Sequence, residues 1–321
     1  VQVEKNLTIW YLPMKHLGAH GFMDCKYLDP QLKALFCFGD QQIFLPHVYR
    51  WCRRRRIPFV AYVGTAHSLD SNFKSKVMNA LFAAGTLRIY KKNPVLAKTS
   101  AAKEELRQLG VPHAVIAPVG LDTAVLKKNI PADEKMRLRK EHGFEADDVI
   151  LCNVSRLSWE KRPLELIDLF LQVKGKKKFK LIIVGNGPLE EELNEKIRKN
   201  GLEKEVKIYP NVPYEKMWEI YEMSDYYLNM NKGEIFGMAI MEAVYYKTSV
   251  AAIRALGPSV TLKDMKGHKL CENDDEMAEW ITGPYPSEKD LQESSEKMAA
   301  TFTWDRCADA FLQASSEKSS R

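Results

Sequence analysis

Hydrophobic runs and amphipathic stretches alternate along the second half of this chain. A continuous apolar run is typical of a strand buried on both faces, and apolar residues that recur every three or four positions are typical of a helix covering it. Runs occur at 149–154, 180–185, 206–209, 225–230 and 248–253, with helical stretches at 163–173, 188–200, 214–223 and 237–246. This order predicts a doubly wound, mainly parallel α/β sheet.

The first part of the chain carries a weaker version of the same pattern. Strands are expected at 7–12, 35–38, 59–63 and 87–90, and helices at 43–55, 71–84 and 99–109. The charged segment 127–148 is expected to be a linker that contains a helix. The sequence therefore predicts two α/β domains joined by this linker.

Composition narrows the class of protein. The chain has 321 residues, 45% of them hydrophobic and 28% charged, which is ordinary for a soluble globular protein and enough for two domains. No apolar run approaches the roughly 20 residues of a membrane span, and no signal peptide opens the chain. The six cysteines are scattered without zinc-ligand spacing, which predicts free thiols in a reducing cytosol. Because the first residue is Val, we expect residues ahead of it in the natural chain.

The net charge of +6 is unevenly placed. Five arginines lie around Trp51 at the end of a predicted helix: Arg50, Arg53, Arg54, Arg55 and Arg56. Such a cluster can dock on anionic lipid or on an anionic acceptor, or it can be a solvated helix end whose cations complement the helix dipole. Aromatic residues do not interleave with the basic ones, so nucleic acid is not an expected partner.

Two glutamates eight positions apart mark the main candidate site. Glu234 is expected in a loop after the strand at 225–230, and Glu242 one turn inside the helix at 237–246. Free backbone N–H groups at the start of that helix form an anion site that suits phosphate. Ionised carboxylates only accept hydrogen bonds, so they suit the hydroxyl groups of a sugar. Phosphate together with a polyol indicates a nucleotide sugar as the ligand.

The spacing of Glu234 and Glu242 resembles the E-x7-E signature of family 4 glycosyltransferases, retaining enzymes with the GT-B fold. Further stretches occur in the family's order. Residues 154–162, VSRLSWEKR, are similar to the family's G-R-L-x-x-x-K-G element, although Ser and Arg replace its glycines. This resemblance implies that Arg156 and Lys161 bind the pyrophosphate of the donor. Fixed cations stabilise the charge of the leaving phosphate without a metal.

Other donor-site residues follow from the same resemblance. VGNGP at 184–188 is similar to the family's V-G-x-G-P turn, with a purely structural turn as the alternative. The resemblance implies that Glu234 contacts hydroxyls of the donor sugar and that Glu242 contacts the ribose. The remaining residues expected to bind the donor are Gly185, Asn186, Gly187, Asn211, Phe236, Gly237 and Met238.

The resemblance also organises the rest of the chain. His67 ends the stretch VGTAH and is expected to line the catalytic cleft, where it would bind a sugar hydroxyl or the acceptor oxygen. FTWD at 302–305 is similar to the F-S-W motif that opens the family's last helix. The expected domains are an acceptor-side Rossmann-like domain at 1–122, a donor-binding one at 123–302, and a C-terminal helix at 303–321 that returns to the first domain. The family's Gly-Gly loop is not found, and residues upstream of Val1 are expected to supply it.

The expected activity is transfer of a hexosyl group from a UDP- or GDP-linked sugar to a glycan or lipid-linked acceptor, with retention and with no metal or cofactor. The expected role is cell-envelope, capsular or exopolysaccharide synthesis. We expect a cytoplasmic protein that docks peripherally on the inner face of the plasma membrane through Arg53–Arg56. Two alternatives stay open on the same fold: a catalytically decayed binding or scaffold subunit, and a nucleotide-sugar epimerase.

Overall fold

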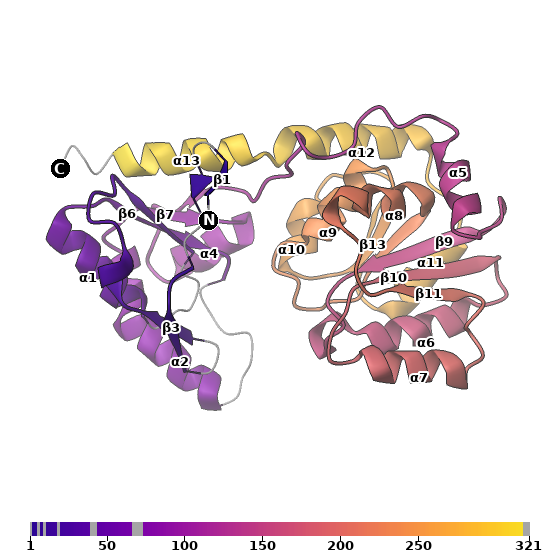
Figure 1. Cartoon of the computed structure of the whole chain (residues 1–321), viewed down its shortest axis with the longest axis horizontal. Helices are drawn as coiled ribbons and strands as arrows, with labels where there is room; N and C mark the ends of the chain where they lie inside the picture. Colours follow the sequence, from indigo (N-terminus) through magenta and orange to yellow (C-terminus); the bar gives the residue numbers. More distant parts are fainter. Residues whose placement is uncertain are drawn as a thin grey trace. The chain divides into compact units, whose positions relative to one another are not determined.

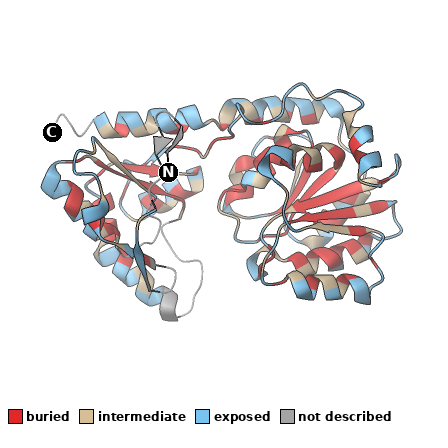
Figure 2. Ribbon diagram, viewed as in Figure 1, coloured by how far each residue is buried: buried red, intermediate tan, exposed pale blue. Residues whose placement is uncertain are grey.

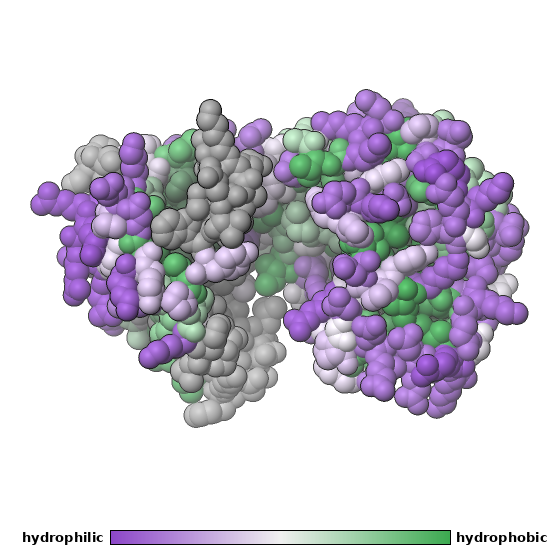
Figure 3. Space-filling model, viewed as in Figure 1, coloured by the Kyte–Doolittle hydropathy of each residue, from purple (hydrophilic) through white to green (hydrophobic). Residues whose placement is uncertain are grey.

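The computed structural model describes residues 2–4, 7–8, 11–17, 20–38, 44–65 and 73–316. The chain forms two compact units (Figure 1). Unit 1 comprises Val1–Pro118 and Asp305–Arg321, and unit 2 comprises Val119–Trp304. No helix in the described part is long and apolar enough to cross a membrane. Hydrophilic residues cover most of the visible face of unit 2 (Figure 3).

Unit 2 is built on six parallel strands in the order β11-β10-β9-β12-β13-β14. The strands are β9 (Val149–Val154), β10 (Phe179–Val184), β11 (Val206–Tyr209), β12 (Tyr226–Asn229), β13 (Ser249–Ile253) and β14 (Lys269–Cys271). The predicted parallel sheet is therefore confirmed. Strands β10 and β11 are added on one side of β9, and β12 to β14 on its other side, so the strand order reverses between β9 and β12. In such sheets, ligands bind at the carboxyl ends of the strands at this switch point.

Helices cover both faces of this sheet. Alternate side chains along a strand enter opposite cores, as Ile150 and Cys152 do on one face and Leu151 on the other. Helices α8 (Met217–Met223), α9 (Met238–Tyr245) and α12 (Glu288–Thr301) contribute to the first core, and α6 (Pro163–Val173), α7 (Glu190–Lys199) and α11 (Asp274–Thr282) to the second. Buried residues accordingly concentrate on the strands and the inner sides of the helices (Figure 2). The linker contains the expected helix, α5 (Glu134–Glu141).

Unit 1 holds a four-stranded parallel sheet in the order β5-β6-β7-β8. Its strands are β5 (Leu35–Phe38), β6 (Phe59–Val63), β7 (Val95–Ala97) and β8 (Val115–Ile116), and its helices are α1 (Leu45–Arg55), α2 (Phe73–Ala84), α3 (Thr86–Tyr90), α4 (Ser100–Gln108) and α13 (Trp304–Ser316). The ring of Phe311 from α13 lies 4.6 Å from that of Phe36 on β5. Helix α13 therefore packs on the sheet of unit 1.

One strand prediction in unit 1 is wrong. Residues 87–90 form helix α3, and the third strand is the three-residue β7, which the sequence pattern did not indicate. A short apolar run fits a buried strand and a buried helix equally well. Here the backbone N–H of Lys91 donates to the carbonyl of Leu87 at 3.0 Å, which closes a helical turn.

The strand expected at 7–12 is also wrong in its length. Of the residues in this stretch that the structure describes, 7–8 form β2 (Leu7–Thr8) and 11–12 form no strand. Strand β2 pairs with β1 (Gln2–Glu4) in an antiparallel ribbon outside the parallel sheet. A second ribbon, β3 (Met14–Leu17) with β4 (His20–Met23), was not predicted. Two-stranded ribbons need little apolar sequence, so their pattern is weak.

Candidate functional site

The predicted donor-binding residues of unit 2 lie at one edge of its sheet. Because the strands are parallel, their carboxyl ends meet at the same edge. Arg156 and Lys161 follow β9, Gly185 to Gly187 follow β10, Asn211 follows β11, and Glu234 follows β12. The fold thus brings together residues from four separate loops, and two of those loops flank the switch point between β9 and β12.

An ion pair joins the two loops at the switch point. The Lys161 Nζ lies 2.8 Å from Glu234 Oε2, with side-chain exposures of 26% and 14%. Glu234 Oε2 also accepts a hydrogen bond from Asn231 Nδ2 at 3.1 Å, and the Phe236 backbone N–H donates to the same carboxylate. Burial raises the pKa of Glu234, but these donors and the Lys161 charge lower it below its ordinary value. Glu234 is therefore an ionised carboxylate in a preformed pocket of donors.

The other cation of this loop differs from Lys161 in its surroundings. Arg156 is exposed and forms no ion pair with any residue that the structure describes. Arg162, which stands where the family has a glycine, has a positive φ of 56°. Its guanidinium is held by Asp274 at 2.9 Å, so it has a structural role. Arg156 is left as a free positive charge at the edge of the sheet.

Gly185 allows the loops after β9 and β10 to pack backbone against backbone. Its φ is +141°, and a Cβ there would lie 1.9 Å from the carbonyl oxygen of Ser155. Ser155 N–H donates to Val184 O at 3.0 Å, and Leu157 N–H donates to Asn186 O at 2.9 Å. The glycine turn therefore positions the loop that carries Arg156 and Lys161. Its contact with a nucleotide stays a prediction, as does that of Asn211.

Helix α9 begins at the same edge. Gly237 precedes it with a φ of 88°, and a Cβ there would lie 2.7 Å from Ile240 Cδ1. Phe236 is buried and its ring lies 6.0 Å from that of Phe302. Met238 is the first residue of the helix and is 37% exposed. The start of α9 is thus anchored by a buried ring, and the Phe236 N–H just ahead of it donates to Glu234.

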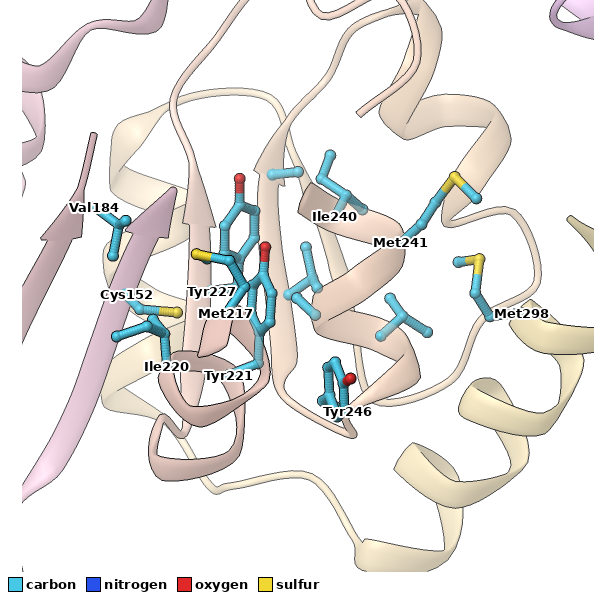
Figure 4. Packing of buried hydrophobic residues seen from close by; sticks show 14 of the residues in the cluster. Cys152, Val184, Met217, Ile220, Tyr221, Tyr227, Ile240, Met241, Tyr246 and Met298 are labelled. Atoms are coloured by element: carbon cyan, nitrogen blue, oxygen red, sulfur yellow. The ribbon is translucent and has the colours of Figure 1, made fainter. Parts of the chain in front are cut away.

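Glu242 lies deeper than the sequence alone indicates. Its side chain is on the core side of α9, the residue is only 8% exposed, and its Oε2 accepts a hydrogen bond from the Tyr221 hydroxyl at 2.7 Å. Burial raises the pKa of Glu242 above its ordinary value, and the bond from Tyr221 offsets part of that rise. Tyr221 in turn belongs to the core shown in Figure 4, with Tyr227 and Tyr246.

Glu242 also lines a shallow depression with Tyr214 and Trp218. Sequence reasoning missed these two aromatic residues. The available signal was their position in the segment that follows β11, since that segment begins at the same edge as the other candidate residues.

Two further predictions concern unit 1. His67 lies outside the described residues.

The predicted arginine cluster lies at the end of α1, and its four arginines are exposed: Arg53, Arg54, Arg55 and Arg56. Trp51 is only 8% exposed, and the Arg55 guanidinium lies 4.6 Å from its ring. Trp51 is therefore part of the core and is not available as an apolar contact for a membrane.

The cysteines and the possible metal ligands of the described residues are the candidates for a second kind of site. All six cysteines are free thiols, and all except Cys37 are buried. Among the residues that the structure describes, no group of three or more His, Cys, Asp or Glu side chains is placed to hold a metal ion.

Known proteins resemble this chain in sequence and in fold. The family described as glycosyl transferases group 1 matches residues 134–298, which is 165 of the 321 residues. D-inositol 3-phosphate glycosyltransferase of Mycobacterium avium (strain 104) is 26% identical over 297 residues, with 82% of this chain and 65% of that protein covered. Alpha-monoglucosyldiacylglycerol synthase of Streptococcus pneumoniae is 24% identical over 139 residues, with 43% of this chain and 32% of that protein covered.

Solved structures add a likeness of fold. HepE of Anabaena, in complex with UDP and glucose, has a TM-score of 0.69 at 19% identity, with 86% of this chain and 76% of that one covered. The chain spans a little under two thirds of the length of the D-inositol 3-phosphate glycosyltransferases that it matches, 65% and 62%.

The family match covers more than half of the chain, and the sheet order agrees with it. This chain belongs to the glycosyl transferases group 1 family and has the GT-B fold.

Proposed function

We propose that this protein is a retaining glycosyltransferase that transfers a hexosyl group from a nucleotide diphosphate sugar without a metal ion. The observation that carries the proposal is the Lys161–Glu234 ion pair across the switch point, beside the free charge of Arg156. A cation next to a hydroxyl-binding carboxylate suits a ligand in which a diphosphate is joined to a sugar.

The chain's residues divide the chemistry between them. As the bond between the sugar's anomeric carbon and the diphosphate breaks, negative charge grows on the leaving phosphate, and Arg156 and Lys161 stabilise it. The first-turn N–H groups of α9 add partial positive charge. When phosphate takes over Lys161, Glu234 is released to accept hydrogen bonds from hydroxyls of the donor sugar. Glu242 and Tyr214 line a small depression, and we propose that the ribose of the donor contacts its rim.

Retention follows if the acceptor attacks from the face that the diphosphate leaves. A new bond then forms between the acceptor oxygen and the anomeric carbon, and the acceptor's proton passes to the leaving phosphate. This route needs no carboxylate nucleophile from the protein. His67 is proposed to contact the sugar or the acceptor oxygen at the same centre.

Relatives guide the choice of substrates. HepE was solved with UDP and glucose, which makes UDP-sugars the first donors to test, with GDP-sugars next. A relative named for monoglucosyldiacylglycerol supports a lipid-linked acceptor, and we propose a glycan or lipid-linked acceptor of the cell envelope. We propose that the reaction takes place on the cytoplasmic side of the plasma membrane.

A donor panel tests the proposal. The protein is incubated with UDP-, GDP- and ADP-sugars in the presence of EDTA, and released nucleotide and the products are followed by NMR. We expect turnover of a UDP- or GDP-sugar, with the anomeric configuration of the donor kept in the product. Nucleotide binding without turnover of any donor would favour the decayed binding subunit. A changed sugar released from the nucleotide would favour the epimerase, and loss of turnover in EDTA would reject metal independence.

A further inference from the structure

A second cavity lies in unit 2, at the opposite edge of the sheet from the loops of Arg156, Lys161 and Glu234, and it adjoins the depression beside Glu242. Its volume is about 810 Å³, within the range of small-molecule sites. It is lined by residues that precede strands, such as Ser224 ahead of β12 and Lys247 ahead of β13. It therefore opens at the amino edge of the sheet, whereas the donor-site residues lie at the carboxyl edge. The four residues of β12 alone separate the two edges by roughly 13 Å.

Four segments that are distant in sequence form the walls of this cavity. They are the linker residues 127–132 ahead of α5, the end of α8, the end of α9, and one side of α12 from Glu288 to Ala299 with the loop before it. In Figure 1 the segment that leads into α5 runs close to α12. The cavity thus lies between the linker and α12, and none of its walls belongs to the loops that hold Arg156, Lys161 or Glu234.

The charges around the cavity balance. Four lysines line it, Lys127, Lys128, Lys135 and Lys247, and three glutamates, Glu222, Glu288 and Glu296. One of the four ammonium groups, that of Lys135, is already held by Asp225 at 2.9 Å. Three cations then face three carboxylates. A phosphate or another anion would add charge to a lining that is already balanced, so the lining favours a ligand without net charge.

The lining also combines rings with hydrogen-bonding groups. Tyr285 is 44% exposed, and it is held in place by a hydrogen bond from its hydroxyl to Asp225 O at 3.1 Å and by the Tyr226 ring at 5.3 Å. Tyr245 adds apolar surface, and the buried Leu291 lies in the wall behind it. Such rings offer a rigid apolar contact at low entropic cost.

Glu222 provides the strongest polar signal. It is half-buried, yet its carboxylate has no hydrogen bond or ion pair with a residue in the described ranges. Burial raises the pKa of Glu222, while the charges of Lys135 and Lys247 oppose the rise. A half-buried carboxylate without a donor costs stability unless a ligand supplies one. A purely apolar ligand would leave it unsatisfied, and a hydroxylated ligand would satisfy it.

We propose that this cavity is a second binding site, specific for a neutral saccharide. The C–H faces of a sugar ring would pack on Tyr245 and Tyr285, and its hydroxyls would donate to Glu222 and exchange hydrogen bonds with Asn129 and Lys247. The site goes beyond the proposed transfer reaction, because it shares no residue with the loops that hold Arg156, Lys161 and Glu234. Two of its residues, Lys127 and Tyr246, also line the depression beside Glu242. It would hold a carbohydrate chain to the protein at a distance from the reacting bond.

Two adjacent alanines of α12 give a matched test. Ala299 lines the cavity, and Ala300 is exposed on the same helix outside it. Ala299→Trp would fill part of the cavity, and Ala300→Trp would add the same ring to solvent. Binding of maltotriose, N-acetylated chitotriose and mannotriose to the full chain is measured by saturation-transfer NMR, with saturating UDP present so that the donor site is occupied. We expect at least one trisaccharide to bind, Ala299→Trp to weaken it at least tenfold, and Ala300→Trp to leave it unchanged.

Thermal melting of each variant and its affinity for UDP show whether the fold is kept. If Ala299→Trp does not fold, Glu222→Ala replaces it, with the same expected loss of binding. The proposal is overturned if no trisaccharide binds, if binding survives both substitutions, or if inorganic pyrophosphate occupies the cavity instead. UDP binding and transfer activity are separate readouts, so failure of this site is distinguishable from failure of the proposed function.

Discussion

Lys161 and Glu234 satisfy each other in the free protein. Both side chains are largely buried, and each would be costly to leave alone, since an unpaired buried charge loses its hydration without compensation. Arg156 makes no such pair with a described residue and stays exposed. The two cations of the same loop therefore differ in their contribution to stability, although we propose the same role for them in the reaction.

Replacing each cation should separate the two contributions. Arg156→Ala should lower turnover at least ~100-fold, the scale for removing one preorganised charge stabiliser, with a change in unfolding free energy within about 0.5 kcal/mol. Lys161→Ala should lower turnover as much and also cost about 1–3 kcal/mol, because Glu234 loses its partner. Steady-state kinetics and urea unfolding measure both effects.

Lys176→Ala is the control for this pair, since Lys176 is an exposed lysine of unit 2 outside the candidate site. It should leave kinetics and stability unchanged. Near-normal turnover in Arg156→Ala or Lys161→Ala would remove that residue from the site.

Glu242 should make stability depend on pH. Its carboxyl is buried, so its pKa in the folded state lies above that of the unfolded chain. As pH rises above the ordinary value of 4.5, the unfolded state loses this proton first, and the folded state is destabilised until its own carboxyl ionises. Gln does not titrate and still accepts the Tyr221 hydrogen bond. Glu242→Gln should therefore be more stable than the wild type at neutral pH and equally stable in acid.

Urea unfolding of the two proteins between pH 4 and pH 8 tests this expectation. A stability difference that stays constant over that range, or that widens toward acid, would mean that the Glu242 carboxyl is not the titrating group. UDP affinity measured on the same samples by calorimetry should fall in Glu242→Gln, if the carboxylate contacts the ribose.

At the scale of elements, the loops after β9 and β10 behave as one unit. Their backbones are hydrogen-bonded to each other, so the glycine turn supports the cation loop directly. Arg162 shows a second consequence of loop geometry. Arg162 has a left-handed backbone conformation, and its guanidinium is held by Asp274 of α11. This contact joins the end of the loop that carries Arg156 and Lys161 to a helix 112 residues later in the sequence.

Adding one methyl group at Gly185 should disturb both loops. Its Cβ would meet the Ser155 carbonyl oxygen at 1.9 Å, while at Gly201, with φ +62°, nothing lies within 4 Å of a Cβ. Gly201→Ala should cost about 1–2 kcal/mol from its backbone conformation alone. Gly185→Ala should cost about 1–3 kcal/mol more, because the neighbouring backbone must move. It should also lower turnover, whereas Gly201→Ala should not.

Thermal and urea unfolding compare the two alanine variants. Equal destabilisation would show that the loops are not packed as closely as the structure has them.

At the scale of the whole molecule, the exposed arginines at the end of α1 bear on membrane docking. Since Trp51 and Leu45 are buried, the proposed contact is electrostatic and should be lost in salt. Each basic residue near an anionic surface contributes about 1 kcal/mol. Arg53→Glu with Arg54→Glu should abolish sedimentation with anionic liposomes at low salt, while leaving Arg55 on the Trp51 ring.

The matched control is Arg198→Glu with Lys199→Glu at the end of α7, which changes the net charge equally on exposed residues of unit 2. This control should sediment like the wild type. If the wild type stays in the supernatant at low salt, the arginines are a solvated helix end.

Most of the fold of unit 2 was predictable from the order of residues. The bounds of β9, β11 and α6 agree with those expected, because each is a strongly patterned run that ends at a turn or at proline. The same pattern placed Arg156, Lys161 and Glu234 after strands, and parallel strands necessarily bring such positions to one edge. The strand prediction at 87–90 failed, because a run of four residues, LRIY, is too short for its period to separate a strand from a helix.

The pattern of hydrophobic and polar residues did not predict which distant residues contact each other. Lys161 and Glu234 are 73 residues apart, and they meet because β9 and β12 are neighbours at the switch point. The hydrogen bond of Glu242 with Tyr221, the backbone packing of Gly185 on Ser155 and the cavity at the amino edge also depend on which helices and loops the sheet brings together. Local hydrogen bonding and apolar spacing act within a few residues and are visible in the sequence. The partners of a side chain depend on the packing of whole elements, which only the folded chain contains.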